Sequence, residues 1–444
     1  MSNHAAPKPV VAYLTAGGAG MFCGSCMRDN TLATALTKLD CDPWLIPLYT
    51  PIRTDEENVA VDRIFFGGIN VYLQQRFRFF RWLPGILDRW LDNSRLLKLV
   101  GQSSIEVKAS ELGELTLSML RGEHGRQKKE VFRLAQWLKR DVRPELVVFS
   151  NILTMGCAPA LKRELGKPVL ATLQGDDLFL EDLIEPYKGT ALAEVRRLAR
   201  AVDGFIVFSE YYADFMADYL QAPRERFRIA PMGLATADLP PEGAADIRRG
   251  VAGGAPKVGY FARICPAKGF DRLIDAWLLL RRRPEFANVK LAAAGWLGGG
   301  DRAFFEAQRT KVEAAGATAD FEYRGVLDRA QKFAFLTELD VFSAPTAYRE
   351  PKGIYVLESL ACGTPVVQPG HGAFPELVGK TGGGMLVAPH DTAALADGLA
   401  ELLGDPARAR RLGEEGRAKV RRDFTADRMA AKTLEIFKEF MPAR

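Results

Sequence analysis

The 444-residue chain has few of the residues that build disulfide scaffolds or metal clusters. It contains six cysteines and four histidines. Six cysteines are too sparse for a disulfide framework at this length, so we expect a reducing, cytoplasmic compartment. Cys23 and Cys26 form one CxxC pair, and no second pair accompanies it in the sequence. We therefore expect these thiols to pack in a tight loop, with a redox or zinc-binding role as the alternative.

A long hydrophobic run is also missing. A membrane-spanning helix needs about 20 consecutive apolar residues. The most apolar stretch, residues 146–161, is interrupted by Ser150, Asn151, Thr154, Gly156 and Pro159. Residues 10–14 follow Lys8 as the core of a signal peptide would, but they run straight into glycines and no clean cleavage site follows. We expect them to form a buried first strand that enters a glycine loop.

Charge of one sign is not in large excess. The chain has 60 basic and 55 acidic residues, a formal net charge of +5. For this length so mild an excess does not indicate a nucleic-acid partner. A content of 48% hydrophobic and 26% charged residues is ordinary for a soluble globular protein. Because single cores stop growing near ~250–300 residues, the length indicates about two domains.

Short apolar runs alternate with helical patterns through the first half of the chain. The strand-like runs lie at residues 10–14, 44–48, 146–150, 169–173, 205–209 and 227–230. Charged stretches with helical spacing separate them, such as residues 128–138 and 192–201. Uniformly apolar strands are typical of a parallel sheet that helices cover on both faces. The pattern therefore predicts an α/β domain.

The composition changes near residues 239–256, which are rich in Pro, Gly and Ala and indicate a linker. Strand-like runs then restart at residues 258–262, 289–294, 340–344 and 365–368. We divide the chain into a domain at 1–234, a linker at 235–254, a second domain at 255–422 and a C-terminal helical segment at 423–444, for which packing against the first domain is one expectation. Ligands of such sheets bind at the carboxyl ends of the strands, so two facing domains predict a cleft between them.

The segment with most chemistry is residues 348–365, YREPKGIYVLESLACGTP. Pro351 and Gly353 indicate a turn, and the apolar spacing after it indicates a helix that begins near Gly353. The free N–H groups of that helix start would bind an anion such as a phosphate. Glu350 lies just before the helix and Glu358 about one turn inside it. The alternative is that both are ordinary solvated carboxylates of a turn and a helix.

A second segment, residues 259–270, has the sequence GYFARICPAKGF. A strand ends here, and Arg263 and Lys268 follow before the next helix. Arginine offers a planar fork for phosphate oxygens and lysine a point charge, so one diphosphate would take both. The alternative is a solvated basic loop.

Together these two segments resemble the retaining glycosyltransferases of family 4, whose GT-B fold has two facing Rossmann-like domains. The family's two glutamates, separated by seven residues that include a glycine, are matched by Glu350 and Glu358. Its Ala-x-Gly-x-Pro-Val-Val tail matches residues 361–367, and its Arg…Lys-Gly pair matches Arg263 and Lys268. Residues 229–233, 325–327 and 340–345 also fit. The resemblance covers the second domain and the layout of the first.

The resemblance implies a role for each matched residue. Arg263 and Lys268 would hold the donor diphosphate, and Glu350 would contact the hydroxyls of the transferred sugar. The remaining donor contacts would come from the ribose-binding Glu358, the base-side Arg324 and Val326, the helix start at Lys352, Gly353, Ile354 and Tyr355, and the glycine loop at Gly17 and Gly18. Members need no metal, because the two cations replace its charge.

The first domain departs more from the family. Residues 17–20 lie where the family has a glycine-rich loop, and a dinucleotide fingerprint is the alternative, but the G-x-G-x-x-G spacing is imperfect. Gln174 stands near the place where many members have a histidine, which puts a histidine role in doubt. Asp176 would bind an acceptor hydroxyl or cap the next helix. The full acceptor set that we expect is Arg28, Asp29, Asn30, Gln174 and Asp176.

Residues 74–99 interleave arginines with phenylalanines and tryptophans. Such a segment would lie on an anionic membrane or form a packed excursion of the first domain, and we expect the packed excursion.

The sequence as a whole predicts a metal-independent enzyme without a cofactor. It would transfer a hexosyl unit from a nucleotide-diphosphate sugar to a hydroxyl of a saccharide, small-molecule or lipid-linked acceptor, with retention. The alternatives are a GT-B epimerase or phosphorylase, or a non-catalytic subunit that binds sugar nucleotides.

Overall fold

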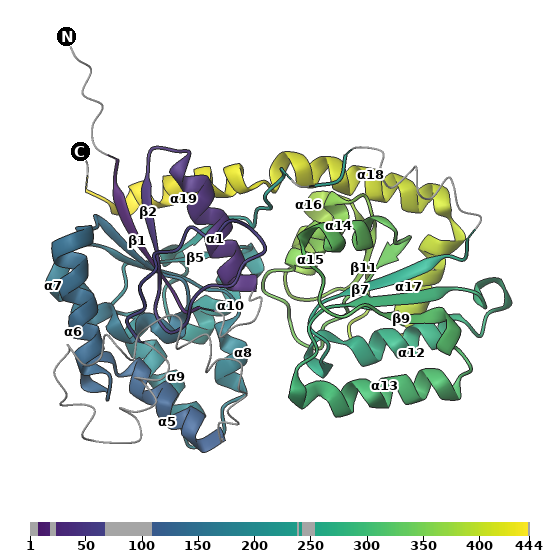
Figure 1. The fold of residues 1–444 in the computed structure, drawn as a ribbon, viewed down its shortest axis with the longest axis horizontal. Helices are drawn as coiled ribbons and strands as arrows, with labels where there is room; N and C mark the ends of the chain where they lie inside the picture. Colours follow the sequence, from purple (N-terminus) through teal and green to yellow (C-terminus); the bar gives the residue numbers. More distant parts are fainter. Residues whose placement is uncertain (1–7, 18–23, 67–108, 238, 242–253, 443–444) are drawn as a thin grey trace, which may run out of the picture. The chain divides into compact units, whose positions relative to one another are not determined.

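The computed structural model describes residues 8–17, 24–66, 109–237, 239–241 and 254–442. Two compact units make up this part of the chain. Unit 1 runs up to Gly233 and takes in the residues from Ala426 onward, whereas unit 2 is the continuous segment Leu234–Thr425. Figure 1 shows that each unit combines strands and helices.

Unit 1 contains a six-stranded sheet whose strand order is β2-β1-β3-β4-β5-β6. All five pairings between neighbours are parallel. The strands are β1 Val10–Thr15, β2 Asp42–Pro47, β3 Leu146–Phe149, β4 Val169–Thr172, β5 Gly204–Val207 and β6 Phe227–Ile229. The parallel sheet predicted from the uniformly apolar runs is confirmed.

Apolar cores cover both faces of this sheet. Ala12 and Leu14 of β1 enter one core, and Val11 and Tyr13 enter the other, because successive strand side chains alternate. The described helices of unit 1 are α1 Gly24–Thr37, α5 Ala109–Leu120, α6 Lys128–Trp137, α7 Ala158–Leu165, α8 Asp176–Glu181, α9 Tyr187–Ala199, α10 Glu210–Leu220 and α19 Ala426–Phe440. Helix α19 packs beside α1, as Figure 1 shows.

Unit 2 also contains a six-stranded parallel sheet, with the order β12-β11-β10-β7-β8-β9. This doubly wound order places a topological switch point between β7 and β10, where such sheets bind ligands. The strands are β7 Lys257–Phe261, β8 Lys290–Ala294, β9 Phe321–Tyr323, β10 Val341–Phe342, β11 Val366–Pro369 and β12 Gly384–Val387.

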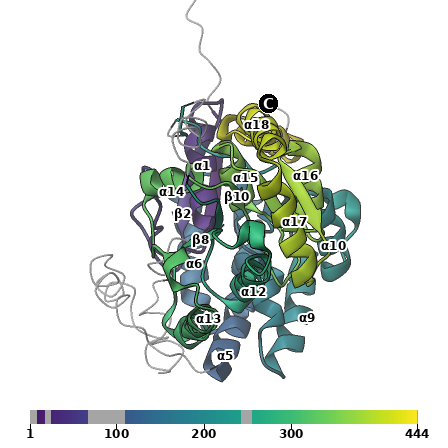
Figure 2. The same ribbon diagram turned by 90° about the vertical axis from the view of Figure 1, so that its right-hand side faces the viewer.

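Helices cover this second sheet. They are α12 Phe270–Leu280, α13 Arg302–Ala314, α14 Arg329–Thr337, α15 Ile354–Ala361, α16 Phe374–Thr381, α17 Thr392–Gly404 and α18 Pro406–Asp423. Helices α12 and α17 pack against each other, and α18 packs on α15 and α16. Figure 2 shows α12, α13 and α17 toward the viewer. The sequence did not predict β9 and β12, because these edge strands are only partly buried and lack a uniformly apolar run.

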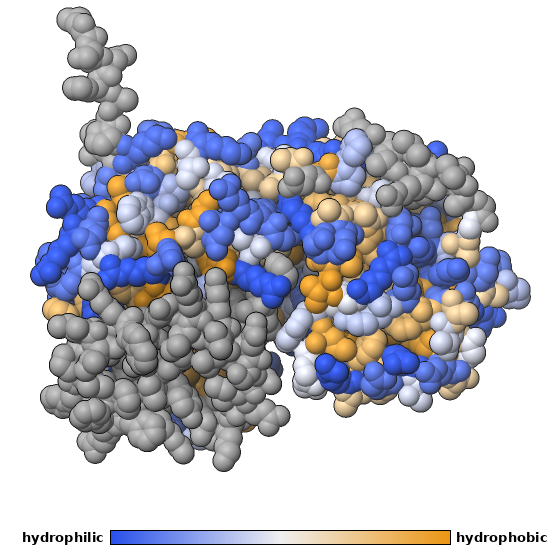
Figure 3. All heavy atoms as spheres, in the orientation of Figure 1, coloured by the Kyte–Doolittle hydropathy of each residue, from blue (hydrophilic) through white to orange (hydrophobic). Residues whose placement is uncertain are grey.

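Several expectations fall outside the described residues. They are Gly18, Cys23, the segment 74–99 that we expected to be a packed excursion, and most of the linker. Within the described ranges, no helix is long and apolar enough to cross a membrane. On the face that Figure 3 shows, hydrophilic and hydrophobic residues are intermixed over both units.

Candidate functional site

The site begins at the turn that precedes α15. Gly353 has φ +66°, and a Cβ at this position would lie 2.7 Å from Cδ1 of Leu377, so the turn requires glycine. Oε1 of Glu350 accepts hydrogen bonds from the backbone N–H groups of Lys352 (3.2 Å) and Gly353 (3.3 Å). Ile354 and Tyr355 then supply the first N–H groups of the helix, which have no partner inside it.

The other oxygen of Glu350 collects three side-chain donors. The ammonium of Lys268 lies 2.8 Å from Oε2, and the hydroxyls of Tyr348 and Tyr355 lie at 3.0 and 2.9 Å. The Glu350 side chain is only 3% exposed. The alternative that Glu350 is a solvated turn residue is therefore wrong.

These donors keep Glu350 ionised although it is buried. Burial by itself raises the pKa of the carboxyl. The charge and hydrogen bond of Lys268 and the hydrogen bond of Tyr355 act in the other direction, and together they lower the pKa to about 2. Glu350 is therefore ionised at neutral pH, with the Lys268 side chain as its nearest partner.

Lys268 reaches this site from the loop after β7. It ends the short 3-10 helix Pro266–Lys268, and Gly269 follows with φ +70° before α12 begins. The ammonium lies 5.0 and 5.1 Å from the ring centres of Tyr348 and Tyr355. Arg263, in the same loop, has a side chain that is 53% exposed and comes within 4.0 Å of Asp301.

Glu358 has a partner that the sequence did not predict. Its Oε1 accepts a hydrogen bond from the ammonium of Lys332 on α14 at 2.8 Å, and both side chains are buried. Glu358 is therefore not a solvated helix carboxylate. The spacing of apolar residues around Lys332 gives no sign of burial, because lysine usually lies on the solvent side of an amphipathic helix.

The two base-side candidates differ in their surroundings. Arg324 pairs with Glu322 at 2.8 Å and with Glu338 at 2.5 Å, and its guanidinium lies over the ring of Phe335. Val326 is 51% exposed at the carboxyl end of the sheet. Of the two, Val326 has the accessible side chain.

In unit 1, three of the acceptor candidates join one buried network around Asp29. Its carboxylate accepts hydrogen bonds from Thr15 (3.0 Å) and Gln174 (3.0 Å), and Arg28 lies 3.4 Å away. Burial raises the pKa of Asp29. The sequence missed Tyr13, which accepts from Arg28 at 2.7 Å, because a tyrosine inside an apolar strand is indistinguishable from an ordinary core residue.

The other unit 1 candidates hold loops. Asn30 bonds to the carbonyl of Glu57 and to the N–H of Val59. Asp176 accepts hydrogen bonds from Asn151 (2.7 Å) and from the backbone N–H of Ile152 (3.0 Å).

Gly17, after β1, has φ +90°. Cys26 is buried, but it lies in helix α1 and not in the tight loop that the sequence predicted.

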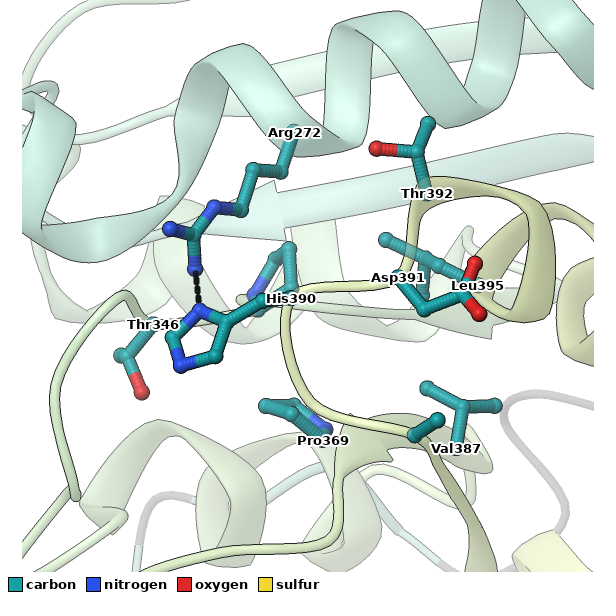
Figure 4. Close-up of a pocket in the computed structure, with 10 residues that line it drawn as sticks. Arg272, Thr346, Pro369, Val387, His390, Asp391, Thr392 and Leu395 are labelled. Carbon is teal, nitrogen blue, oxygen red and sulfur yellow. Dashed lines mark hydrogen bonds between the residues drawn. The ribbon is translucent and has the colours of Figure 1, made fainter.

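A small pocket opens elsewhere on unit 2, where β11 and β12 end and α12 and α17 begin (Figure 4). Arg272 points toward His390 and lies 2.7 Å from its Nδ1. Thr346, Pro369, Val387 and Leu395 are among the other lining residues. None of these residues was a sequence candidate.

The geometry thus brings Lys268, Glu350 and the start of α15 together, next to the switch point between β7 and β10. A cation and free helix N–H groups at this edge of a doubly wound sheet are the arrangement with which α/β proteins bind phosphate groups. Arg263 lies in the same loop as Lys268, and Glu358 lies one turn farther into α15.

Comparison with known proteins defines the family. Residues 246–419 match the family model described as "Glycosyl transferases group 1", and residues 113–238 match "Glycosyltransferase Family 4". The chain belongs to this family of retaining glycosyltransferases, which use nucleotide sugars as donors.

Curated relatives are similar over more than half of the chain. A GDP-mannose-dependent α-(1-6)-phosphatidylinositol monomannoside mannosyltransferase of Mycolicibacterium smegmatis is 30% identical, covering 58% of this chain and 67% of that protein. The Mycobacterium tuberculosis protein of the same name is 29% identical over 63% of this chain and 72% of its own length.

Solved structures share the fold. Sucrose-phosphate synthase from Thermosynechococcus elongatus has a TM-score of 0.71 at 18% identity, covering 97% of this chain and 98% of that one. Anabaena HepE, solved in complex with UDP, has a TM-score of 0.67 at 17% identity, with 97% and 100% covered. The GT-B fold that the sequence predicted is confirmed.

Proposed function

We propose that the protein transfers a hexosyl unit from a nucleotide-diphosphate sugar to an acceptor hydroxyl, with retention of the anomeric configuration. The observation that carries this proposal is that Lys268, from the loop after β7, reaches Glu350 just before the start of α15. An ammonium and free backbone N–H groups stabilise the negative charge of a diphosphate as it departs. The hexose is proposed because similar proteins include mannosyltransferases that use GDP-mannose.

In this proposal, different residues of unit 2 bind the diphosphate, the ribose and the base of the donor. Arg263 and Lys268 hold the diphosphate, Glu358 accepts hydrogen bonds from the ribose hydroxyls, and the base lies near Val326. The exposed side chain of Arg263 and the exposed Val326 support this order. We place the acceptor at the carboxyl edge of the unit 1 sheet, beside the network that Thr15 and Gln174 form with Asp29.

Transfer proceeds without a metal ion in this proposal. Arg263 and Lys268 supply the positive charge that a divalent cation supplies elsewhere. The acceptor class spans saccharides, small molecules and lipid-linked sugars, since similar proteins act on a phosphatidylinositol mannoside and on 2-deoxystreptamine.

A thermal-shift panel of UDP-, GDP- and ADP-sugars tests the donor. A ligand at 100 times its Kd stabilises the folded state by ~2.7 kcal/mol. Product analysis of the stabilising donor, with and without acceptors, then separates the alternatives. An epimerase would release an isomerised donor without acceptor, a phosphorylase would require inorganic phosphate, and a binding subunit would give no product. Any of these results would overturn the proposed transfer.

A further inference from the structure

Arg28, on α1 in unit 1, is a buried cation that has two N–H donors without an acceptor. The residue is only 1% exposed. Arginine binds carboxylates and phosphates best through two parallel N–H groups, which form a fork. In Arg28 the adjacent Nε and Nη2 form such a fork, and neither reaches an acceptor in the part of the chain that the structure describes. Because buried charged donors are normally paired, this fork indicates a ligand.

The rest of the Arg28 guanidinium is held in place. Its Nη1 donates to the hydroxyl of Tyr13 at 2.7 Å. That hydroxyl lies in turn 3.0 Å from Oγ1 of Thr172. The guanidinium also lies over the ring of Phe208, 5.1 Å from the ring centre. These contacts fix the plane of the guanidinium, so the fork of Nε and Nη2 is oriented before a ligand arrives.

Asp29 does not occupy this fork. Its Oδ1 lies 3.4 Å from Nη1, which is not one of the two unpartnered nitrogens. That distance is longer than the ~2.8 Å of a good charge-assisted hydrogen bond. The carboxylate accepts instead from Thr15 and Gln174, each at 3.0 Å. Asp29 therefore offsets part of the charge of Arg28 but leaves Nε and Nη2 for another oxyanion.

Gln174 carries a second unpartnered atom in the same network. Its Nε2 donates to Asp29 at 3.0 Å and to the carbonyl of Ser150 at 2.9 Å. These two acceptors settle the orientation of the amide. Its Oε1 is buried, and no donor among the described residues reaches it. A carbonyl oxygen accepts from a hydroxyl. The network therefore fits a ligand that carries both an oxyanion and a hydroxyl.

The network lies at the edge of the sheet where ligands bind. Thr15 and Thr172 are the last residues of β1 and β4. Ser150 follows β3, and Phe208 follows β5. Parallel sheets of this type bind ligands at the carboxyl ends of their strands.

We propose that Arg28 forms an oxyanion site in unit 1, which binds a phosphate or carboxylate group of the acceptor, and that Gln174 accepts a hydrogen bond from a hydroxyl of the same ligand. The proposal rests on the proposed function only where it calls the ligand the acceptor, because the donor diphosphate is assigned there to unit 2. It narrows the acceptor from any hydroxyl compound to an anionic one.

Calorimetry with inorganic phosphate and with acetate tests the site. Each anion is titrated with and without saturating UDP or GDP, whichever the wild-type protein binds, and sodium chloride keeps the ionic strength constant. We expect the wild type to bind at least one of the two anions while the nucleotide is bound. Arg28→Lys keeps the charge but loses the fork, so it should weaken this binding by about 10-fold or more.

The outcomes separate the possible ligands. Binding of phosphate alone supports a phosphorylated acceptor, and binding of acetate alone supports an acceptor with a carboxylate. The proposal is overturned if the wild type binds neither anion, or if Arg28→Lys binds as well as the wild type. It is also overturned if saturating nucleotide abolishes anion binding, because the anion would then occupy the donor site.

A matched control is Arg163→Lys in unit 1, where Glu123 already fills the guanidinium fork at 2.9 and 2.8 Å. This variant should bind the anions as the wild type does. Thermal unfolding checks that Arg28→Lys is folded. Tyr13→Phe tests the same fork with the ring kept, and it should weaken anion binding by about threefold to fivefold because Nη1 loses its partner. Wild-type affinity in Tyr13→Phe would show that the fork is not positioned as proposed.

The nucleotide titration reports separately on the proposed function. A protein that binds neither UDP nor GDP, but binds phosphate or acetate in a way that depends on Arg28, would overturn the proposed donor. The oxyanion site would then stand, and its assignment to an acceptor would fall.

Discussion

The ammonium of Lys332 lies 2.8 Å from Oε1 of Glu358, and the two side chains are 4% and 8% exposed. The pair joins α14 to α15. Val326 lies in the loop just before α14, so the pair also fixes that loop relative to the start of α15 at Ile354. A buried ion pair is costly to break from one side, because the remaining charge has no water to solvate it.

We first predict that Lys332→Met destabilises the protein by roughly 3–5 kcal/mol, since Glu358 would be left buried and unpaired. Urea unfolding at neutral pH measures this free energy. The double variant Lys332→Met with Glu358→Leu should recover most of the loss because both charges are then absent. A double variant that is less stable than Lys332→Met would contradict the prediction.

The second prediction concerns nucleotide affinity. Glu358→Gln should raise the Kd for the bound nucleoside diphosphate by about 10- to 100-fold, as expected for loss of ~1.5–3 kcal/mol of charged hydrogen bonding to the ribose. Calorimetry measures the Kd, and circular dichroism checks the fold. Glu376→Gln on α16, whose carboxylate pairs with Lys380 at the surface, is the control. Equal affinity in Glu358→Gln and the control would remove Glu358 from the ribose site.

The third prediction follows from the low pKa of Glu350. Its value of about 2 in the folded protein lies below the usual value of 4.5. The contribution of this group to stability is therefore complete above about pH 4.5 and is lost as the pH falls toward 2. A shift of this size corresponds to roughly 3 kcal/mol. Urea unfolding across this range should show a shallower pH dependence for Glu350→Gln than for the wild type, and equal slopes would refute the assignment.

The fourth prediction is that EDTA leaves transfer and nucleotide binding essentially intact, because the proposed function assigns the positive charge at the diphosphate to Arg263 and Lys268. Turnover with the donor from the panel is compared with EDTA and with added Mg²⁺ or Mn²⁺. A strict requirement for either ion would show that these two side chains do not replace it.

The fifth prediction tests the turn that delivers Lys268. Gly269→Ala should destabilise unit 2, because a Cβ would lie 1.8 Å from the carbonyl oxygen of Pro345 at a φ of +70°. Gly316→Ala is a matched control, since Gly316 has φ +65° but nothing within 4 Å of the added Cβ. Both carry the strain of a positive φ, of about 1 kcal/mol. Thermal unfolding should show a clearly larger loss for Gly269→Ala, and equal losses would contradict the steric argument.

The central strands of both sheets could be predicted from the sequence because they are buried on two sides. Runs such as 146–150 and 169–173 are apolar at four of five positions, and the structure places strands within one residue of each. Edge strands β9 and β12 face solvent on one side, so their composition is mixed and resembles loops. Burial produces the pattern that makes a strand recognisable.

The main-chain geometry of the site could also be predicted, but its side-chain partners could not. Pro351 and Gly353 mark a turn and a helix start through local backbone rules. By contrast, Lys332 meets Glu358 across 26 residues, and Lys268 meets Glu350 across 82. Such pairs form only because the sheet brings their helices and loops together. A single sequence does not show which distant residues become neighbours in space.

Helix α19 has a consequence for how the chain is made. Its residues Met429, Leu434 and Phe437 share a core with Val11 and Leu32 of β1 and α1, so unit 1 is assembled from both ends of the chain. Unit 2 is the continuous segment Leu234–Thr425. During vectorial synthesis on the ribosome, unit 2 therefore has all its residues before unit 1 does. Until α19 emerges, α1 covers only part of that face of the unit 1 sheet, and the core on that face stays incomplete.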